Sequence, residues 1–126
     1  MTTTRASKAF LAFSAAVWLP YGLYCLLEPG SLAESAGVTA TTTTGTVELR
    51  AMYGGLQAAL GALALGGLLR GAWQRHALFA LLFVCAGLGS ARLFGAFSAA
   101  DCSQYTAVAL TFELGSTAIA GWLLSR

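Results

Sequence analysis

Charged side chains are scarce in this chain, at 10% of its 126 residues, whereas a soluble domain carries about a quarter. A soluble protein needs such residues to cover its surface, so most of this surface is expected to meet something other than water. Hydrophobic residues make up 57% of the sequence, and the mean hydropathy is +0.72. These values predict a membrane protein.

Patterns typical of metal sites, nucleic-acid binding and catalysis are missing as well. Cys25, Cys85 and Cys102 have no C-x-x-C spacing, and the single histidine, His76, is expected in a loop. The net charge of +2 is small, and no basic run is interleaved with aromatic residues. The expectation is therefore no metal, no cofactor, no nucleic-acid partner and no catalytic residue.

Four apolar stretches are each long enough to cross a bilayer, which takes about 20 residues. They are expected as helices at about 8–27, 47–69, 77–97 and 105–124. The predicted fold is all-α, a single transmembrane domain built as an integral membrane bundle of four helices. A cleaved signal peptide is the alternative for the first stretch, but its apolar run is long for one and no small-x-small cleavage site follows.

The segments between these stretches are polar or rich in helix-breaking residues. They comprise Glu28-Pro29-Gly30, a threonine-rich loop at 31–46 with room for a short interfacial helix at 32–36, a tight connection at 74–76 and a turn at 101–104. Cys25 and Cys102 both approach the same end of the bundle, so a disulfide between them is geometrically conceivable.

Charge placement orients the spans. The basic residues outside the spans fall on one side, and they are Arg5, Lys8, Arg70, Arg75 and Arg126. The acidic residues at span ends and loops fall on the other, and they are Glu28, Glu34, Glu48 and Asp101. Because short cytoplasmic segments carry the excess of Lys and Arg, both termini are predicted to lie in the cytoplasm.

Three ionisable residues lie inside the spans, where a charge is costly unless it is paired or hydrated. At about 1.5 Å of rise per residue, Arg50 lies roughly one turn below the outer end of its span and Arg92 at a similar depth. Glu113 is nearer the middle of the bilayer. All three belong to the outer half or the midplane, so the sequence predicts that they could meet in one cavity.

Helical spacing gives each span an inward face. Arg50 shares its face with Tyr53, Gln57 and Gly61, and Glu113 shares its face with small and polar residues. The first span is expected to turn Ser14, Trp18, Tyr21, Tyr24 and Cys25 inward, whereas Leu123 of the last span is expected to point elsewhere. These faces predict a polar pocket that opens outward.

The predicted ligand-binding residues are Arg50, Tyr53, Gln57, Arg92 and Glu113. Two arginines against one glutamate leave a positive surplus, which favours a small anionic molecule or a lipid headgroup. The purely structural alternative also stays open: Glu113 could neutralise Arg92 or Arg50 to fix the helix register. Arg50 could equally extend its side chain to the interface without any partner.

The segment from Glu48 to Leu56, which reads E-L-R-A-M-Y-G-G-L, resembles the start of the second helix in a bacterial membrane family, domain of unknown function 4345. Ala91 to Gly95 and Phe112 to Gly115 are similar to two later motifs of that family, whereas Cys102 and Ser103 depart from its pattern. The resemblance implies a compact four-helix membrane protein, with no established activity, in a bacterial inner membrane.

Three classes of function follow. The favoured one is binding of a small anionic molecule or membrane lipid, with Arg50 and Arg92 as cationic donors, Glu113 as counter-charge, and Tyr53 and Gln57 as hydrogen-bonding groups. One alternative is a structural or accessory subunit, which could be a homo-oligomer. The other is an oligomeric transporter or proton-coupled channel using Glu113. An enzyme is the least supported class.

Overall fold

The computed structural model describes residues 4–126, and every regular element in that range is helical. The long helices are α1 (Arg5–Leu27), α4 (Leu56–Leu69), α5 (Gly71–Ala99) and α6 (Gln104–Leu124). The short elements are a 3-10 turn η1 (Pro29–Ser31), α2 (Leu32–Ala36), α3 (Thr43–Leu49) and a π-helical turn η2 (Arg50–Gly55). With α3, η2 and α4 taken as one continuous helix, four helices are long and apolar enough to cross a membrane. The predicted all-α membrane fold is confirmed.

The connections differ in part from the prediction. The short helix foreseen at 32–36 is present as α2, but the expected loop ends early because α3 already begins at Thr43. The Thr42 side chain caps α3 by accepting a hydrogen bond from the Gly45 N–H at 3.0 Å, which satisfies an N–H that the helix itself leaves unpaired. A cap of this kind is what makes a threonine-rich segment start a helix.

The tight connection predicted at 74–76 is wrong. Arg70 alone, in an extended conformation, separates α4 from α5, and Gln74 and His76 lie within α5. Gln74 is buried there, whereas His76 is exposed. At the other end of the molecule, Gln104 is likewise the first residue of α6 and not part of the turn.

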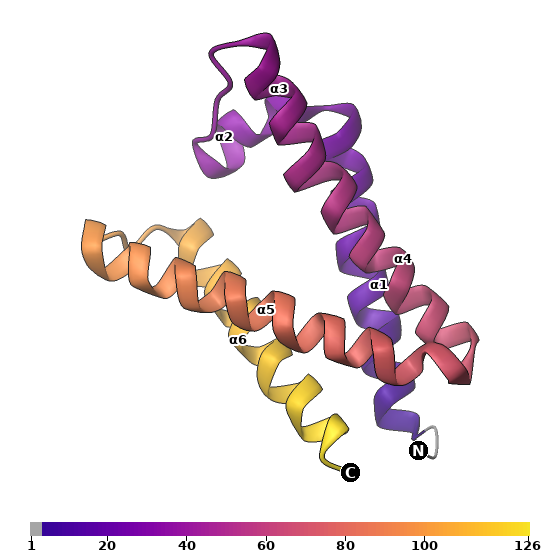
Figure 1. Ribbon diagram of the computed structural model, residues 1–126. Coiled ribbons are helices and arrows are strands. Elements are labelled where there is room, and N and C mark those ends of the chain that lie inside the picture. The colour runs from indigo at the N-terminus through magenta and orange to yellow at the C-terminus, as the bar shows by residue number, and fades with distance from the viewer. Residues whose placement is uncertain (1–3) are drawn as a thin grey trace.

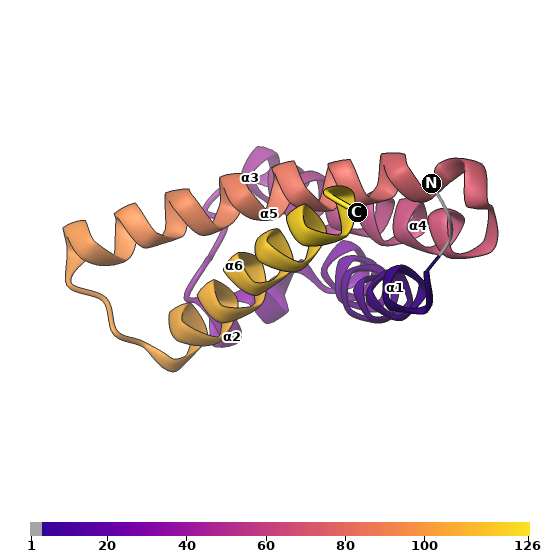
Figure 2. The same cartoon turned by 90° about the horizontal axis from the view of Figure 1, so that it is seen from below.

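The helices form two pairs. α1 runs alongside α4, and α6 folds back along α5 (Figure 1). The two pairs join at Arg70, where α4 meets α5, and they diverge toward the ends that carry α2, α3 and the turn before α6. Seen from below, α5 extends well beyond α1, which is viewed nearly end-on (Figure 2). The molecule is therefore closed at one end and open at the other.

Glycines set the distance between α1 and α4. A Cβ on Gly22 would lie 2.3 Å from the backbone nitrogen of Ala58, and one on Gly61 would lie 2.3 Å from that of Leu19. No side chain fits in either place, so the two backbones are in direct contact. Small residues that allow such an approach are typical of helix pairs in membranes.

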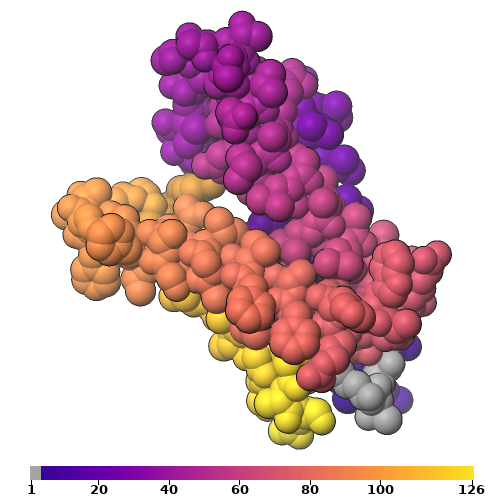
Figure 3. All heavy atoms as spheres, viewed as in Figure 1, coloured from indigo at the N-terminus to yellow at the C-terminus, as the bar shows by residue number. Residues whose placement is uncertain are grey.

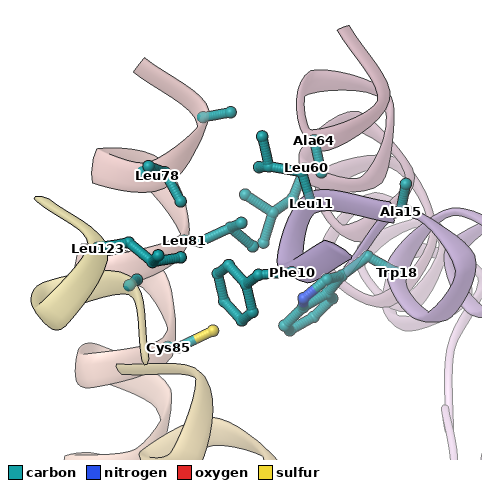
Figure 4. Packing of buried hydrophobic residues seen from close by; sticks show 12 residues of the cluster. Phe10, Leu11, Ala15, Trp18, Leu60, Ala64, Leu78, Leu81, Cys85 and Leu123 are labelled. Carbon is teal, nitrogen blue, oxygen red and sulfur yellow. The ribbon is translucent and has the colours of Figure 1, made fainter. Parts of the chain in front are cut away.

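The hydrophobic core lies where the two pairs meet (Figure 4). Its largest members are Phe10, Leu11, Trp18, Leu60, Leu78, Leu81 and Leu123. Two expected orientations are wrong. Leu123 is buried, because it continues the stripe of Glu113, Ser116 and Ala120 on α6. Tyr24 is exposed, because Tyr21 and Cys25 occupy the inward positions on either side of it.

Candidate functional site

Arg92 of α5 and Glu113 of α6 form a bidentate ion pair. The Arg92 Nε donates to Glu113 Oε2 at 2.9 Å, and Nη2 donates to Oε1 at 2.7 Å. The Glu113 side chain is only 5% exposed, whereas that of Arg92 is 28% exposed. Two parallel charge-assisted hydrogen bonds fix the geometry of both groups and offset part of the cost of burying the carboxylate.

Gly89 allows this pairing. It lies one turn before Arg92 on α5, and a Cβ there would stand 2.8 Å from a methyl carbon of Leu114 and 3.4 Å from the Glu113 Cβ. Because Gly89 has no side chain, α6 approaches α5 closely at the level of the ion pair. The short distance between the helices lets the carboxylate reach two nitrogen atoms of the guanidinium group, Nε and Nη2.

Tyrosines surround the pair on its exposed side. The Arg92 Cζ lies 5.8 Å from the centre of the Tyr105 ring, a cation–π distance, and Tyr53 is close enough to act on the guanidinium charge. Tyr21 of α1 is within side-chain hydrogen-bonding range of Tyr105. The site therefore draws on α5 and α6 from one helix pair, and on α1 and η2 from the other.

Arg50 does not join this group. Its Nη1 donates to the Leu26 carbonyl at 2.9 Å, in the last turn of α1. The last carbonyls of a helix have few partners within the helix, and its C-terminal end carries a partial negative charge. Arg50 therefore ties η2 to the end of α1, and of the three ionisable residues the structure brings only Arg92 and Glu113 together.

Tyr53 and Gln57, the two remaining predicted site residues, are both half-buried. The Gln57 Oε1 is buried and has no hydrogen-bond partner within residues 4–126. A buried amide oxygen without a partner costs free energy, so it marks a position where a ligand or water could donate a hydrogen bond.

Deeper in the bundle, α1 contributes two more buried polar atoms that lack a partner in the described chain, Ser14 Oγ and Trp18 Nε1. The Trp18 ring packs against Phe112 of α6, with centroids 5.6 Å apart, and points into the core in Figure 4. This contact joins α1 to α6 at the residue next to Glu113.

Sequence reasoning missed two contributors. Tyr105 is not among the predicted site residues, although it lies two turns before Glu113 and so close to its face. The π-helical turn η2 was also unforeseen, although it coincides with the R-A-M-Y-G-G segment and its adjacent glycines. Single π turns within α-helices are frequent at functional sites.

The surface is notched between the outer ends of the two helix pairs. Figure 3 shows a notch between the outer part of α5 and α6 and the opposite arm of α3 and η2. A guanidinium group has five N–H donors, and Glu113 accepts two of them. No protein acceptor within residues 4–126 takes the other three, which are available to a hydrogen-bond acceptor that enters the notch.

The cysteines do not form the conceivable disulfide. Cys25 is buried and Cys102 is exposed, and both are free thiols, as is the buried Cys85. A thiol–disulfide function between Cys25 and Cys102 therefore has no geometric support in this conformation.

Comparison with known proteins agrees with the motifs in the sequence. The model of one family, described as Domain of unknown function (DUF4345), matches residues 6–124. No curated protein and no solved structure matches the chain. With nearly its whole length covered, the chain belongs to the DUF4345 family.

Proposed function

We propose that this membrane protein binds a small amphipathic molecule with an anionic headgroup in the notch between its two helix pairs. The observation that carries the proposal is the state of Arg92. Its side chain is 28% exposed, and Glu113 takes only two of its five N–H groups. An acceptor-rich headgroup would satisfy the remaining donors.

The electrostatics define the headgroup. Glu113 offsets much of the Arg92 charge, and Arg50 is held by the end of α1, so the site has less positive surplus than the sequence suggested. Binding would then depend on directional hydrogen bonds from Arg92, Tyr53 and Tyr105 more than on net charge. A carboxylate or a phosphodiester on an apolar chain has the required acceptors.

The charge distribution orients the site in the membrane. Five basic residues gather at the closed end of the molecule, which supports the expectation that both termini lie in the cytoplasm of a bacterium with the notch facing outward. The ligand would then enter from the outer leaflet or the space beyond the inner membrane.

Thermal unfolding of the detergent-solubilised protein tests the proposal, with oleate and lysophosphatidic acid as acidic probes and a monoglyceride as the neutral one. Both acidic probes should raise the Tm of the wild type by several degrees, and the monoglyceride should not, since only binding to the native state stabilises it. The double variant Arg92→Gln/Glu113→Gln should lose the shift. It removes both charges at once and so leaves no unpaired ion.

Arg5→Gln is the matched control, because Arg5 begins α1 at the closed end of the molecule, away from the notch. This variant should keep the full rise in Tm. Equal shifts in the wild type and the double variant would show that the probes bind elsewhere. No shift with any acidic probe would remove the proposal.

A second candidate, an accessory subunit or a homo-oligomer, has one observation in its favour. Phe94 and Phe97, on the outer part of α5, are 75% and 81% exposed. A helix of a partner or of a second copy could cover them. Chemical crosslinking in mild detergent tests this, and a strictly monomeric pattern that Phe94→Ala/Phe97→Ala leaves unchanged would count against it. Proton-coupled transport has less support, because both oxygens of Glu113 are engaged by Arg92.

A further inference from the structure

A second candidate binding surface lies at the opposite end of the molecule from the notch. Leu63 of α4 and Trp73 and His76 of α5 line an open, almost wholly apolar hollow of about 320 Å³. One wall is fixed in place by a glycine, because a Cβ on Gly66 would stand 2.6 Å from the Trp73 ring. The edge of the indole therefore packs directly against Gly66 of α4.

The charge around this hollow is of one sign. All the basic residues outside the outer half belong to this end, and they are Arg5, Lys8, Arg70, Arg75 and Arg126. The five acidic residues of the sequence lie elsewhere. Arg70 stands at the rim, with its Cζ 5.0 Å from the centre of the Trp73 ring, and His76 is exposed on the lining helix.

We infer that this hollow binds one anionic phospholipid of the basic-side leaflet. An acyl chain would lie against Leu63 and the Trp73 ring, and the phosphate would meet Arg70 and His76. The two halves of the surface match the two halves of such a lipid: the wall is apolar and the rim is cationic. Basic pockets between membrane helices on the cytoplasmic side commonly bind anionic headgroups. The inference does not rest on the ligand proposed for the notch.

Native mass spectrometry of the purified full chain, loaded with phosphatidylglycerol or phosphatidylcholine in detergent, tests the inference. The wild type should retain phosphatidylglycerol at least about fivefold more than phosphatidylcholine. The double variant Arg70→Gln/His76→Gln should bring that ratio close to one. Both positions are exposed, so the variant is expected to fold, and circular dichroism verifies that it does.

Arg126→Gln is a closely matched control. Arg126 lies 4.6 Å over the Trp122 ring, the same arrangement at the same end, but on α6 and outside the lining of the hollow. It should keep the preference. If Arg126→Gln lost the preference for phosphatidylglycerol as fully as the double variant, the lipid would bind to a diffuse basic surface and not to this site. If the wild type retained both lipids equally, only apolar contact would hold them. Either result would overturn the inference.

Two further measurements test the apolar wall and the cationic rim of the hollow separately. Gly66→Leu should displace Trp73 and lower retention of phosphatidylglycerol, with the rim charges left in place. Inorganic phosphate, at concentrations where it competes with the headgroup, should reduce retention only slightly. Complete displacement by phosphate would mean that the rim binds the anion alone, and the inference of a lipid site would fail.

Discussion

Arg92 and Glu113 differ in how well each could tolerate the loss of the other. Glu113 is almost completely buried, so removing Arg92 would leave a carboxylate without a partner in an apolar layer. Arg92 is partly exposed and has a long flexible stem, so without Glu113 its guanidinium could extend toward water. The pair is therefore asymmetric, and the two single variants should not be equivalent.

We expect Arg92→Gln to lower the free energy of unfolding by about 3 kcal/mol, the lower end of the range for breaking a buried pair, because Arg92 is partly exposed. Glu113→Gln should cost clearly less, and the double variant should cost less than Arg92→Gln alone. Denaturant unfolding in detergent measures all three. Equal costs for the two single variants would show that both groups are equally hydrated.

Ala100 is the one residue other than glycine with a positive φ within residues 4–126, at 52°. It follows α5, and the bonds from the Ala100 N–H to the Phe97 carbonyl and from the Asp101 N–H to the Ala96 carbonyl close a Schellman motif. This position favours glycine, because a Cβ is strained in the left-handed region.

Ala100→Gly should therefore raise the free energy of unfolding, by about 1 kcal/mol. Ala99→Gly, one residue earlier and still helical, is the matched control and should lower it by up to about 1 kcal/mol. Thermal unfolding of both variants in one detergent gives the comparison. Destabilisation by Ala100→Gly would contradict the left-handed assignment.

Asp101 lies two residues before Ser103, the N-cap of α6, and supports it. Its carboxylate accepts hydrogen bonds from the Ser103 N–H at 2.9 Å, from the Ser103 hydroxyl at 3.2 Å and from the Thr106 hydroxyl. The bond from Thr106 does most to lower the pKa of Asp101 below its ordinary value, and the Ser103 bonds add to it. A carboxylate with a lowered pKa in the folded state stabilises that state when ionised.

The sign of the pH effect follows. The contribution is fully present above the ordinary pKa of 3.8 and is lost as the pH falls through the lowered folded value. Acidification below about pH 4 should therefore lower the Tm of the wild type more than that of Asp101→Asn, which has no group to protonate there. Parallel Tm curves for the two proteins over this range would exclude a role for this carboxylate.

At the scale of elements, the sequence predicted the four long helices well because length and apolar content decide them. It predicted their faces less well on the second span. In the π turn at Arg50–Gly55 each hydrogen bond spans one residue more than in an α-helix. Residues that would share one face of a regular helix therefore no longer line up across this turn. Gly54 is buried there, while Tyr53 is half-buried and Arg50 is exposed.

One of the two arginine contacts at the outer end was predictable from the sequence, and the other was not. Arg92 and Glu113 are opposite charges, in the outer half and near the midplane, on helices joined by a short turn, so their pairing could be anticipated from sequence. The partner of Arg50 could not, because a backbone carbonyl at the end of α1 carries no sequence signal. Pairing of helix ends becomes visible only when the helices are placed in space.

The contact between α1 and α4 depends on glycine. Gly61→Ala should lower the free energy of unfolding by about 1–3 kcal/mol, because the added Cβ meets the Leu19 backbone, which cannot rotate away. Gly115→Ala on α6 is the control. A Cβ there meets nothing within 4 Å, so the variant should be neutral or slightly stabilising. Equal effects in denaturant unfolding would mean that helix propensity, and not packing, governs both.

At the scale of the whole molecule, the two helix pairs are joined at one end by a close contact between α4 and α5. A Cβ on Gly67 of α4 would stand 2.8 Å from the Ala77 Cβ of α5, next to the connection at Arg70. Toward the outer ends, Tyr21 of α1 and Tyr105 of α6 interact across the two pairs. Hydropathy alone cannot distinguish such a two-pair arrangement from an evenly packed bundle, because both bury similar residues.

The native cysteines report which end of the molecule faces out of the cell. Cys102 lies in the exposed turn before α6, whereas Cys25 and Cys85 are buried. If both termini are cytoplasmic, a membrane-impermeant maleimide should label intact cells at Cys102 alone, and Cys102→Ser should abolish the signal. On that background His76→Cys, at an exposed position near the opposite end, should be labelled only after the membrane is permeabilised. Labelling of His76→Cys in intact cells, with protection of Cys102, would place the basic end outside. The notch and its Arg92–Glu113 pair would then face the cytoplasm, and the proposed ligand would have to come from there.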